Sequence, residues 1–588
     1  MKKFRFKFFH WLLVGLCLSW LWACSAGLAP GKPNGSVSVD SFESAQKVLQ
    51  EKFLPKIEVD KELVSDQVAT RYAVNQISDP VPKLEDFPLY GAQPTNDPNT
   101  VYIEIFSSAE KASAQKQDER WLVDVAEAFN AQKLTVSSGQ VIQVGIRNIP
   151  SGLGAQILAA KAAKPVGYTP TTDLWLEILK SEGVTSVMLT PVLVPNQAGF
   201  AVHSQVYQDL AAGGEVTFER LLDSILAGKL TIGNANPYAG SPPLNLLYTL
   251  FWRAAGHHQD QKPLTVADLQ SPQVNSVFDA FNKQVLTTAL TYLDLKQIFI
   301  RDRQKLQAFP IEYQSYVTLK RLPGFEQTAF VPFGVPHNSP LVGFDWNTPT
   351  QQEALKKFGE FATSAPMQQL AKTQGFEVTD YLKRGNFPPR PTGEVLKAAQ
   401  SFWKQRKDGG RTVYMMVVID TSGSMDGDRL KAVKQGLQTA SSEINAGNYV
   451  GLITFGDRPK SLIPLAPFDT LQHQRLLAAI DALTADGSTA MYDGMMVGLA
   501  ELMEHKKTDP NGRFYLLLLS DGQANQGLNF EQVKDIVKYS GVRVYPIAYG
   551  EVNQQELQAT ARLRESTVQA GNPKNVQRLL KELFQTNL

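Results

Sequence analysis

Short apolar runs alternate with amphipathic stretches along most of the chain, and this alternation predicts strands and helices in turn. The run 101–108 (VYIEIFSS) is followed by an amphipathic stretch at 120–130, and the run 141–149 (VIQVGIRNI) by another at 152–163. The first pattern of each pair is typical of a buried strand and the second of a helix. Their order predicts an α/β fold, with a parallel sheet covered by helices on both faces.

The same kind of pattern continues as far as residue 376. It comprises two extended runs at 187–202, a strand, turn and helix at 230–252 that place Ser241 as an N-cap, strands at 308–319 and 330–336, and a closing pair of helices at 350–376. This order over about residues 98–376 resembles that of the extracellular solute-binding proteins of the periplasmic type. The resemblance implies two α/β lobes around a hinge, with a ligand cleft between them.

Polar residues lie at the carboxyl ends of several of these strands, where open α/β sheets bind their ligands. On the resemblance, a solute or a partner would contact Ser107, Ser108, Ser151, Asn236 and Tyr313, the last from a hinge-like strand. Serine at a strand end also serves ordinary turn and helix-cap chemistry. Both interpretations of these residues stay open at the level of the sequence.

A second α/β pattern follows a proline-containing connector. Buried-strand runs occupy 411–419, 449–455 and 513–520, and each is followed by a polar loop. Because parallel strands end at the same edge of a sheet, the strand-to-helix loops can converge on one point. The side chains that they bring together are Asp420, Ser422, Ser424, Thr489 and Asp521.

All five of these side chains offer oxygen, with no histidine or thiol among them, so the fitting metal is a hard divalent cation such as Mg²⁺. Two ionised carboxylates about 6 Å apart repel by roughly 3 kcal/mol at an effective dielectric constant near 20. A bound cation removes that repulsion.

The set resembles the metal-ion-dependent adhesion site of the von Willebrand factor A domain, whose pattern is Asp-x-Ser-x-Ser, then a distant Thr, then a distant Asp. Asp420, Ser422, Ser424, Thr489 and Asp521 match that pattern in order. The resemblance covers about residues 412–588 and implies a Rossmann-like, doubly wound sheet, although 566–572 is a poor candidate for its last edge strand. It also implies that a carboxylate of a partner protein, from Asp or Glu, completes the coordination of the metal.

The first residues predict export. A basic start is followed by thirteen uncharged residues, 11–23, which is a secretory signal pattern and is too short for a stable membrane span. Leu21-Trp22-Ala23-Cys24 resembles a bacterial lipoprotein box, which implies a lipid anchor on Cys24; cleavage by ordinary signal peptidase, for example after Ala26, is the alternative. The Gly-, Pro- and Ser-rich stretch 27–38 is typical of a flexible tether.

Composition and charge narrow the function further. Lys plus Arg number 58 and Asp plus Glu 57, so no excess of positive charge draws the chain to nucleic acid. The cysteines, Cys17 and Cys24, are both in the leader region, which excludes a disulfide framework in the folded body. We find no phosphate-binding loop, zinc-protease motif or nucleophile elbow, and we expect a protein without catalytic activity.

These observations predict an exported two-module binding protein in the cell envelope or periplasm, held to a membrane by its lipid. Its expected organisation is a signal peptide (1–23), a tether and N-terminal segment (24–97), a solute-binding-protein-like region (98–376), a connector (377–411) and a von Willebrand factor A domain (412–588). One alternative is a substrate receptor of an ATP-driven importer with an accessory C-terminal domain. A second is a hydrolase whose site the sequence does not display.

Overall fold

The computed structural model describes residues 39–74, 81–113, 119–521, 524–550 and 554–588. The signal sequence, Cys24 and the predicted tether lie outside the described residues, so the predictions made for them stay predictions. Among the helices that are described, none combines the length and apolar character needed to cross a membrane.

The C-terminal region is built on a seven-stranded sheet in the order β1-β15-β14-β13-β16-β17-β18. The strands are β1 (Asp60–Lys61), β13 (Val413–Asp420), β14 (Tyr449–Phe455), β15 (Pro459–Pro467), β16 (Arg513–Ser520), β17 (Arg543–Tyr549) and β18 (Gln569–Gly571). Neighbouring strands run parallel except at the β14–β15 pair. Every residue of β13 is buried, as expected for a central parallel strand covered on both faces.

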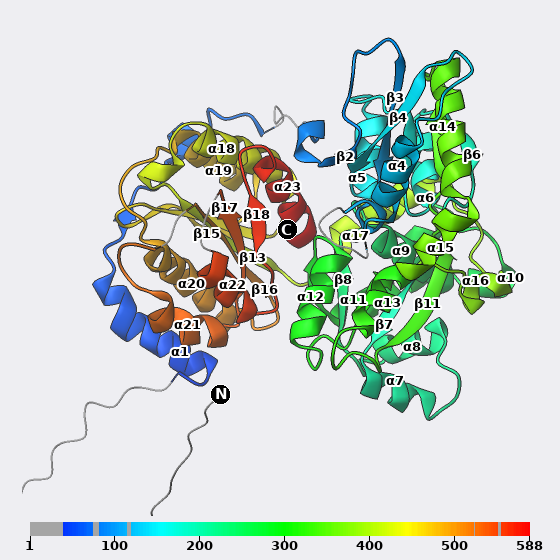
Figure 1. Ribbon diagram of the computed structural model, residues 1–588. Helices are drawn as coiled ribbons and strands as arrows, with labels where there is room; N and C mark the ends of the chain where they lie inside the picture. Colours follow the sequence, from blue (N-terminus) through cyan, green and yellow to red (C-terminus); the bar gives the residue numbers. More distant parts are fainter. Residues whose placement is uncertain (1–38, 75–80, 114–118, 522–523, 551–553) are drawn as a thin grey trace, which may run out of the picture. The chain divides into compact units, whose positions relative to one another are not determined.

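Helices cover both faces of this sheet (Figure 1). One apolar cluster joins the sheet to α18 (Asp428–Ser441), α19 (Thr470–Ala482) and α23 (Val576–Asn587). A second cluster, on the other face, joins it to α20 (Met491–Thr508), α21 (Phe530–Tyr539) and α22 (Gln554–Arg562). The doubly wound architecture predicted for this region is confirmed.

An N-terminal segment to which the sequence assigns no role packs on the same sheet. Helix α1 (Phe42–Val48) buries Ala45 and Val48 in the cluster that contains α20 and α21, and Figure 1 shows α1 beside α21. Strand β1 pairs with β15, and the short helix α2 (Asp66–Ala69) is tied to α19 by an ion pair between Asp66 and Arg475. The C-terminal sheet therefore includes residues from both ends of the described chain.

The chain between the N-terminal segment and the C-terminal region forms two α/β lobes. The first lobe has the sheet order β2-β4-β3-β5-β12-β6 and the second β11-β7-β10-β8-β9. The strands of the first are β2 (Leu89–Gly91), β3 (Thr100–Ser107), β4 (Val141–Asn148), β5 (Gly167–Thr169), β6 (Ser186–Thr190) and β12 (Leu341–Phe344). Those of the second are β7 (Gln197–Val202), β8 (Ile232–Ala235), β9 (Val285–Ala289), β10 (Ala308–Glu312) and β11 (Ala329–Pro336). The chain enters the second lobe after β6 and returns after β11, which confirms the two-lobed α/β prediction.

Helices cover each lobe. Those of the first lobe are α3 (Ala109–Ala112), α4 (Trp121–Ala131), α5 (Ser151–Ala159), α6 (Leu174–Ser181), α14 (Pro349–Ala362) and α15 (Ala365–Thr373). Those of the second are α7 (Ser204–Ala211), α8 (Phe218–Leu226), α9 (Ser241–Ala254), α10 (His257–Asp260), α11 (Pro272–Lys283), α12 (Tyr292–Arg301) and α13 (Tyr313–Lys320). The connector contributes α16 (Asp380–Arg384) and α17 (Gly393–Arg406).

Three local predictions differ from the structure. The strand expected at 308–319 ends at Glu312, and helix α13 begins at Tyr313, because the side chain of Asn196 accepts a hydrogen bond from the Gln314 N–H and so acts as a cap from a distant segment. Gly240, not Ser241, is the N-cap of α9; the Ser241 hydroxyl instead accepts from the Trp175 indole. The doubtful edge strand at 566–572 does form, as β18, parallel to β17.

Candidate functional site

Three turns meet at the carboxyl edge of the C-terminal sheet. The first follows β13 and contains a short 3₁₀ turn at Gly423–Met425, the second precedes α20, and the third follows β16. The Gly423 N–H donates to the Gly487 carbonyl at 3.0 Å, and the Asp486 N–H donates to the Thr421 carbonyl at 2.8 Å. These backbone bonds tie the first turn to the second.

Side chains join the first turn to the third. The Ser424 hydroxyl donates to Asp521 Oδ1 at 2.7 Å, and the Ser422 and Ser424 hydroxyl oxygens lie 3.1 Å apart. Ser424 is thus within hydrogen-bonding distance of two other predicted ligands, Ser422 and Asp521, although Asp521 is 97 residues from Ser424 in sequence.

Asp420 is held at the base of the site. Its Oδ1 accepts from the Ser422 N–H at 2.9 Å and its Oδ2 from the Ser520 hydroxyl at 2.6 Å. Burial raises the pKa of the Asp420 carboxyl above its ordinary value, while the bonds to Ser422 and Ser520 oppose that rise. Ser520 is a supporting residue that the sequence analysis missed; its position directly before Asp521 was the available signal.

Thr489 is buried in the second turn and is anchored by Asn525. Its N–H donates to Asn525 Oδ1 at 2.9 Å, and the Asn525 N–H donates to the Thr489 carbonyl at 3.2 Å. Asn525 was not predicted, because nothing in its spacing marks it out. Its two bonds hold the Thr489 backbone to the segment that follows β16.

The donor set suits a hard divalent cation. It offers two carboxylates and three hydroxyls, and all of these are oxygen donors of the kind that Mg²⁺ binds, often together with waters. Ser424 is exposed to solvent, whereas Asp420 is fully buried. An ion could thus be held between a buried carboxylate and an exposed hydroxyl. Arg429 also contacts the site: its Nη1 lies 2.5 Å from Asp521 Oδ2.

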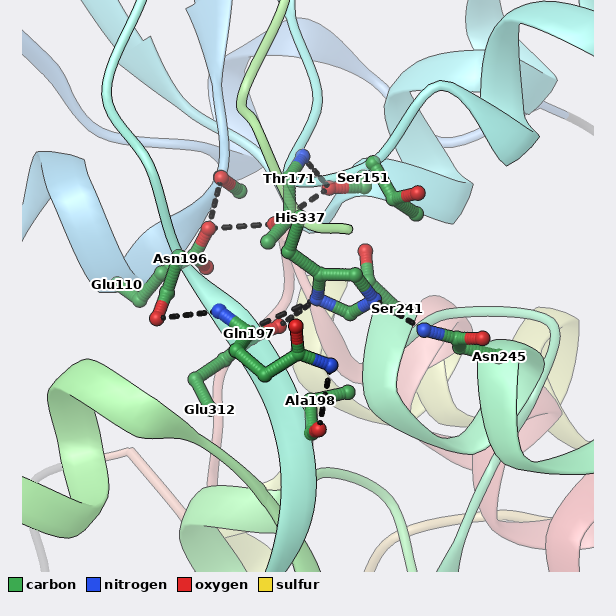
Figure 2. Close-up of polar contacts among 12 residues, drawn as sticks. Glu110, Ser151, Thr171, Asn196, Gln197, Ala198, Ser241, Asn245, Glu312 and His337 are labelled. Atoms are coloured by element: carbon green, nitrogen blue, oxygen red, sulfur yellow. Dashed lines mark hydrogen bonds and ion pairs between the residues drawn. The ribbon is translucent and has the colours of Figure 1, made fainter. Parts of the chain in front are cut away.

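The serines predicted for the interlobe cleft lie in a buried polar cluster, of which Figure 2 shows Ser151 with Thr171 and Glu110. Ser108 donates to the Glu110 carboxylate and accepts from Lys111 Nζ at 2.7 Å. The Ser151 and Thr171 hydroxyls are 3.3 Å apart, and Thr171 donates to Glu110 at 2.5 Å. Ser107 is also fully buried, with its hydroxyl 3.5 Å from the Ser108 carbonyl.

A second buried group completes this cluster on the side of the second lobe. His337 Nδ1 lies 2.8 Å from Glu312 Oε1, and His337 Nε2 lies 2.9 Å from the Asn245 amide nitrogen. Figure 2 shows His337 between these two residues. Both residues are fully buried, and burial raises the pKa of Glu312 while His337 opposes that rise. The sequence analysis missed Glu110, Lys111, Glu312 and His337, each of which lies at or just beyond a strand end.

The lobes contact each other directly at this cluster. The Gly152 N–H donates to the Ala239 carbonyl at 3.1 Å, and the Trp175 indole donates to Ser241 at 2.9 Å. Groups at the start of α5 and α9, where a ligand would be expected, thus bond to the opposite lobe. Buried atoms with no hydrogen-bond partner among the described residues remain nearby, namely Asn196 Nδ2, Gln197 Oε1 and Ser339 Oγ.

The structure places two of the predicted cleft residues elsewhere. The Asn236 amide donates to Gln585 Oε1 at 2.9 Å, and the Tyr313 hydroxyl donates to Glu377 Oε1 at 3.0 Å. Tyr313 lines a separate cavity of about 1070 Å³ in the second lobe, together with Tyr316, Phe330 and Tyr381. The five predicted residues therefore do not form one site.

Comparisons with known proteins cover parts of the chain. An uncharacterized protein of Synechocystis is 26% identical over 175 residues, which is 29% of this chain and 40% of that protein. A UPF0353 protein of Mycolicibacterium paratuberculosis is 31% identical over 152 residues, or 23% of this chain and 44% of its own. The chain thus spans less than half the length of either relative.

Among solved structures, the sulfate-binding protein SubI of Mycobacterium tuberculosis aligns with 50% of this chain and 92% of its own, at 15% identity and a TM-score of 0.34. Residues 415–582 match the family model of the von Willebrand factor type A domain. Residues 415–582, which include most of the C-terminal sheet and its helices, are therefore a von Willebrand factor type A domain.

Proposed function

We propose that this protein is a non-catalytic binding protein whose C-terminal domain engages a carboxylate of a partner protein through a divalent cation, Mg²⁺ in the simplest case. The ligands would be Asp420, Ser422, Ser424, Thr489 and Asp521. The observation that supports this most is the contact of Ser424 with Asp521 at 2.7 Å and with Ser422 at 3.1 Å, since it brings oxygens from separate turns to one place.

The charges are consistent with an acidic partner. With Asp420 and Asp521 ionised, a bound Mg²⁺ gives these three groups a formal charge of zero. A carboxylate that approaches the metal then gains an ionic contact without meeting excess negative charge. Ser424 is exposed, so a group from solvent can reach this proposed ligand.

Affinity capture from envelope extracts tests this function. With immobilised protein, we expect a specific partner to be retained in Mg²⁺ and released by EDTA, and the variant Asp420→Ala to retain none. Asp426→Ala is the matched control, because Asp426 is an exposed carboxylate beside the same turn. Capture that is unchanged by both EDTA and Asp420→Ala would contradict the proposal.

We further propose that the chain is exported and anchored by a lipid on Cys24. The support is the leader pattern and the cysteine in its lipoprotein-like box. Detergent phase partitioning tests this: the native protein should enter the detergent phase, and Cys24→Ser should not. Partitioning of both proteins into the aqueous phase would contradict the anchor.

A second candidate function is solute capture by the lobes, as in a receptor of an ATP-driven importer. The specific observation in its favour is the set of buried, unpartnered atoms of Asn196, Gln197 and Ser339 between the lobes. A small polar solute that stabilises the native protein against heat, but not Asn196→Ala, would support it. A broad panel of anions, sugars and amino acids that leaves the melting temperature unchanged would count against it.

A further inference from the structure

Arg429 already places a positive charge on one of the proposed metal ligands. Its Nη1 lies 2.5 Å from Asp521 Oδ2 and donates to the Ser424 carbonyl at 3.2 Å. Asp521 Oδ1 is meanwhile occupied by the Ser424 hydroxyl. Both oxygens of this carboxylate therefore have protein partners, and one of those partners is a cation.

The two members of this ion pair differ in exposure. The Asp521 side chain is fully buried, whereas the Arg429 side chain is 41% exposed. The backbone of Arg429 is fixed in the first turn of α18, where its carbonyl accepts from the Tyr549 hydroxyl at 3.1 Å. The guanidinium can therefore leave toward solvent by side-chain rotation alone, while its Cα stays in place.

We propose that Arg429 is a tethered competitor of the divalent cation at Asp521, so that the metal binds only as the guanidinium withdraws. This inference rests on the function proposed above. Both cations seek the same carboxylate, and two like charges a few ångströms apart repel. The expected consequence is a metal affinity that is lower than the five oxygens alone would give.

The competition also assigns a role to an acidic partner. A partner that offers a carboxylate to the metal places negative charge near the released guanidinium. The guanidinium can then pair with that charge instead of with Asp521. The partner thereby favours the metal-loaded state, and by linkage the metal favours the partner. Arg429 would couple the two events.

Isothermal titration of Mg²⁺ into the metal-stripped full chain tests the inference. We expect Arg429→Gln to bind Mg²⁺ about tenfold more tightly than the wild type, as expected when an opposing ion pair of roughly 1.4 kcal/mol is removed. Arg429→Lys keeps the charge and should stay closer to the wild type. Lys431→Gln is the matched control, since Lys431 is an exposed cation on the same helix.

The outcomes separate this inference from the function on which it rests. Wild-type affinity in both Arg429 variants, with binding still lost in Asp420→Ala, would overturn the role of Arg429 and leave the metal site standing. Affinity that is equal in the wild type, Asp420→Ala and Asp521→Asn would overturn the metal site itself. A thermal unfolding scan in EDTA verifies that each variant is folded.

Discussion

The proposed metal site of the C-terminal domain and the buried polar cluster between the lobes contain the same kinds of side chain but differ in what their polar groups contact. Both gather hydroxyls and carboxylates at the carboxyl ends of strands. In the cleft, Glu312 is paired with His337, and the fully buried Lys111 donates to Ser108 and Thr169. In the proposed metal site the Ser424 hydroxyl contacts the Ser422 hydroxyl and the Asp521 carboxylate, and Ser424 is exposed. A polar residue at a strand end thus indicates a polar site. Whether that site binds a ligand or only joins parts of the protein depends on the balance of charge among its side chains and on their exposure to solvent.

The largest expected effect comes from the buried pair in the cleft. His337→Leu leaves the Glu312 carboxylate buried without its partner, so we expect the free energy of unfolding to fall by about 3 to 5 kcal/mol. Urea-induced unfolding measures the loss. The double variant Glu312→Gln/His337→Leu should recover part of it, and a loss below about 1 kcal/mol in the single variant would contradict an internal, stabilising role.

The next largest effect on stability is expected where the two lobes are in close contact. A Cβ added at Gly152 would lie 1.9 Å from the Tyr238 carbonyl oxygen, whereas one at Gly154 would meet Tyr168 at 3.2 Å. We expect Gly152→Ala to destabilise the protein by about 3 kcal/mol, and Gly154→Ala by much less, because overpacking forces backbone shifts. Thermal unfolding compares the two variants, which share a helix and a substitution. Equal melting temperatures would show that the lobes do not meet here.

Lys111 predicts a smaller, pH-dependent effect. Burial lowers the pKa of its ammonium from 10.5 to about 8, so above pH 8 the unfolded chain binds more protons at this site than the folded chain. Stability should therefore rise with pH, by about 2 kcal/mol up to about pH 9.5, and this increment should be absent in Lys111→Met. Urea unfolding at several pH values measures it. Parallel pH profiles of the two proteins would contradict the buried, charged state of Lys111.

The smallest effect on stability is expected at the proposed metal site when no metal is bound. Burial raises the pKa of Asp420, so without metal the folded protein stabilises the ionised carboxylate less well than the unfolded chain does. Asp420→Asn removes that charge, and we expect the free energy of unfolding in EDTA to change by less than about 1 kcal/mol, toward greater stability. Chemical unfolding in EDTA measures the change. A large loss of stability would mean that Asp420 is mainly a structural residue.

The convergence of the turns at the proposed metal site could be predicted from the sequence, because Asp420, Ser422, Ser424 and Asp521 come at or just after strand ends whose apolar runs are unmistakable. Asp420 and Asp521 each terminate or follow a fully buried strand, so the topology alone brings them together. Thr489 lies in the turn just before helix α20, so the topology also places it at this edge of the sheet. Local pattern and global fold agree at this site.

The polar contacts between the lobes could be predicted only in part, because they join segments that are far apart in sequence. Glu312 and His337 have no local spacing that marks them as a pair, and Asn196 caps α13 from a segment over a hundred residues earlier. The same holds for α1, whose partner helices lie more than 400 residues later. Propensity and periodicity do not reveal such partners.

Crystals of the protein grown with Mn²⁺, a hard cation with an anomalous signal, test whether the five oxygen ligands bind a divalent cation. We expect one anomalous peak, within about 2.3 Å of oxygens from Ser422 and Ser424 and close to Thr489, Asp420 and Asp521. We also expect the Arg429 guanidinium to be displaced from Asp521. Absence of any peak at these oxygens, at a Mn²⁺ concentration that saturates other oxygen sites, would contradict it.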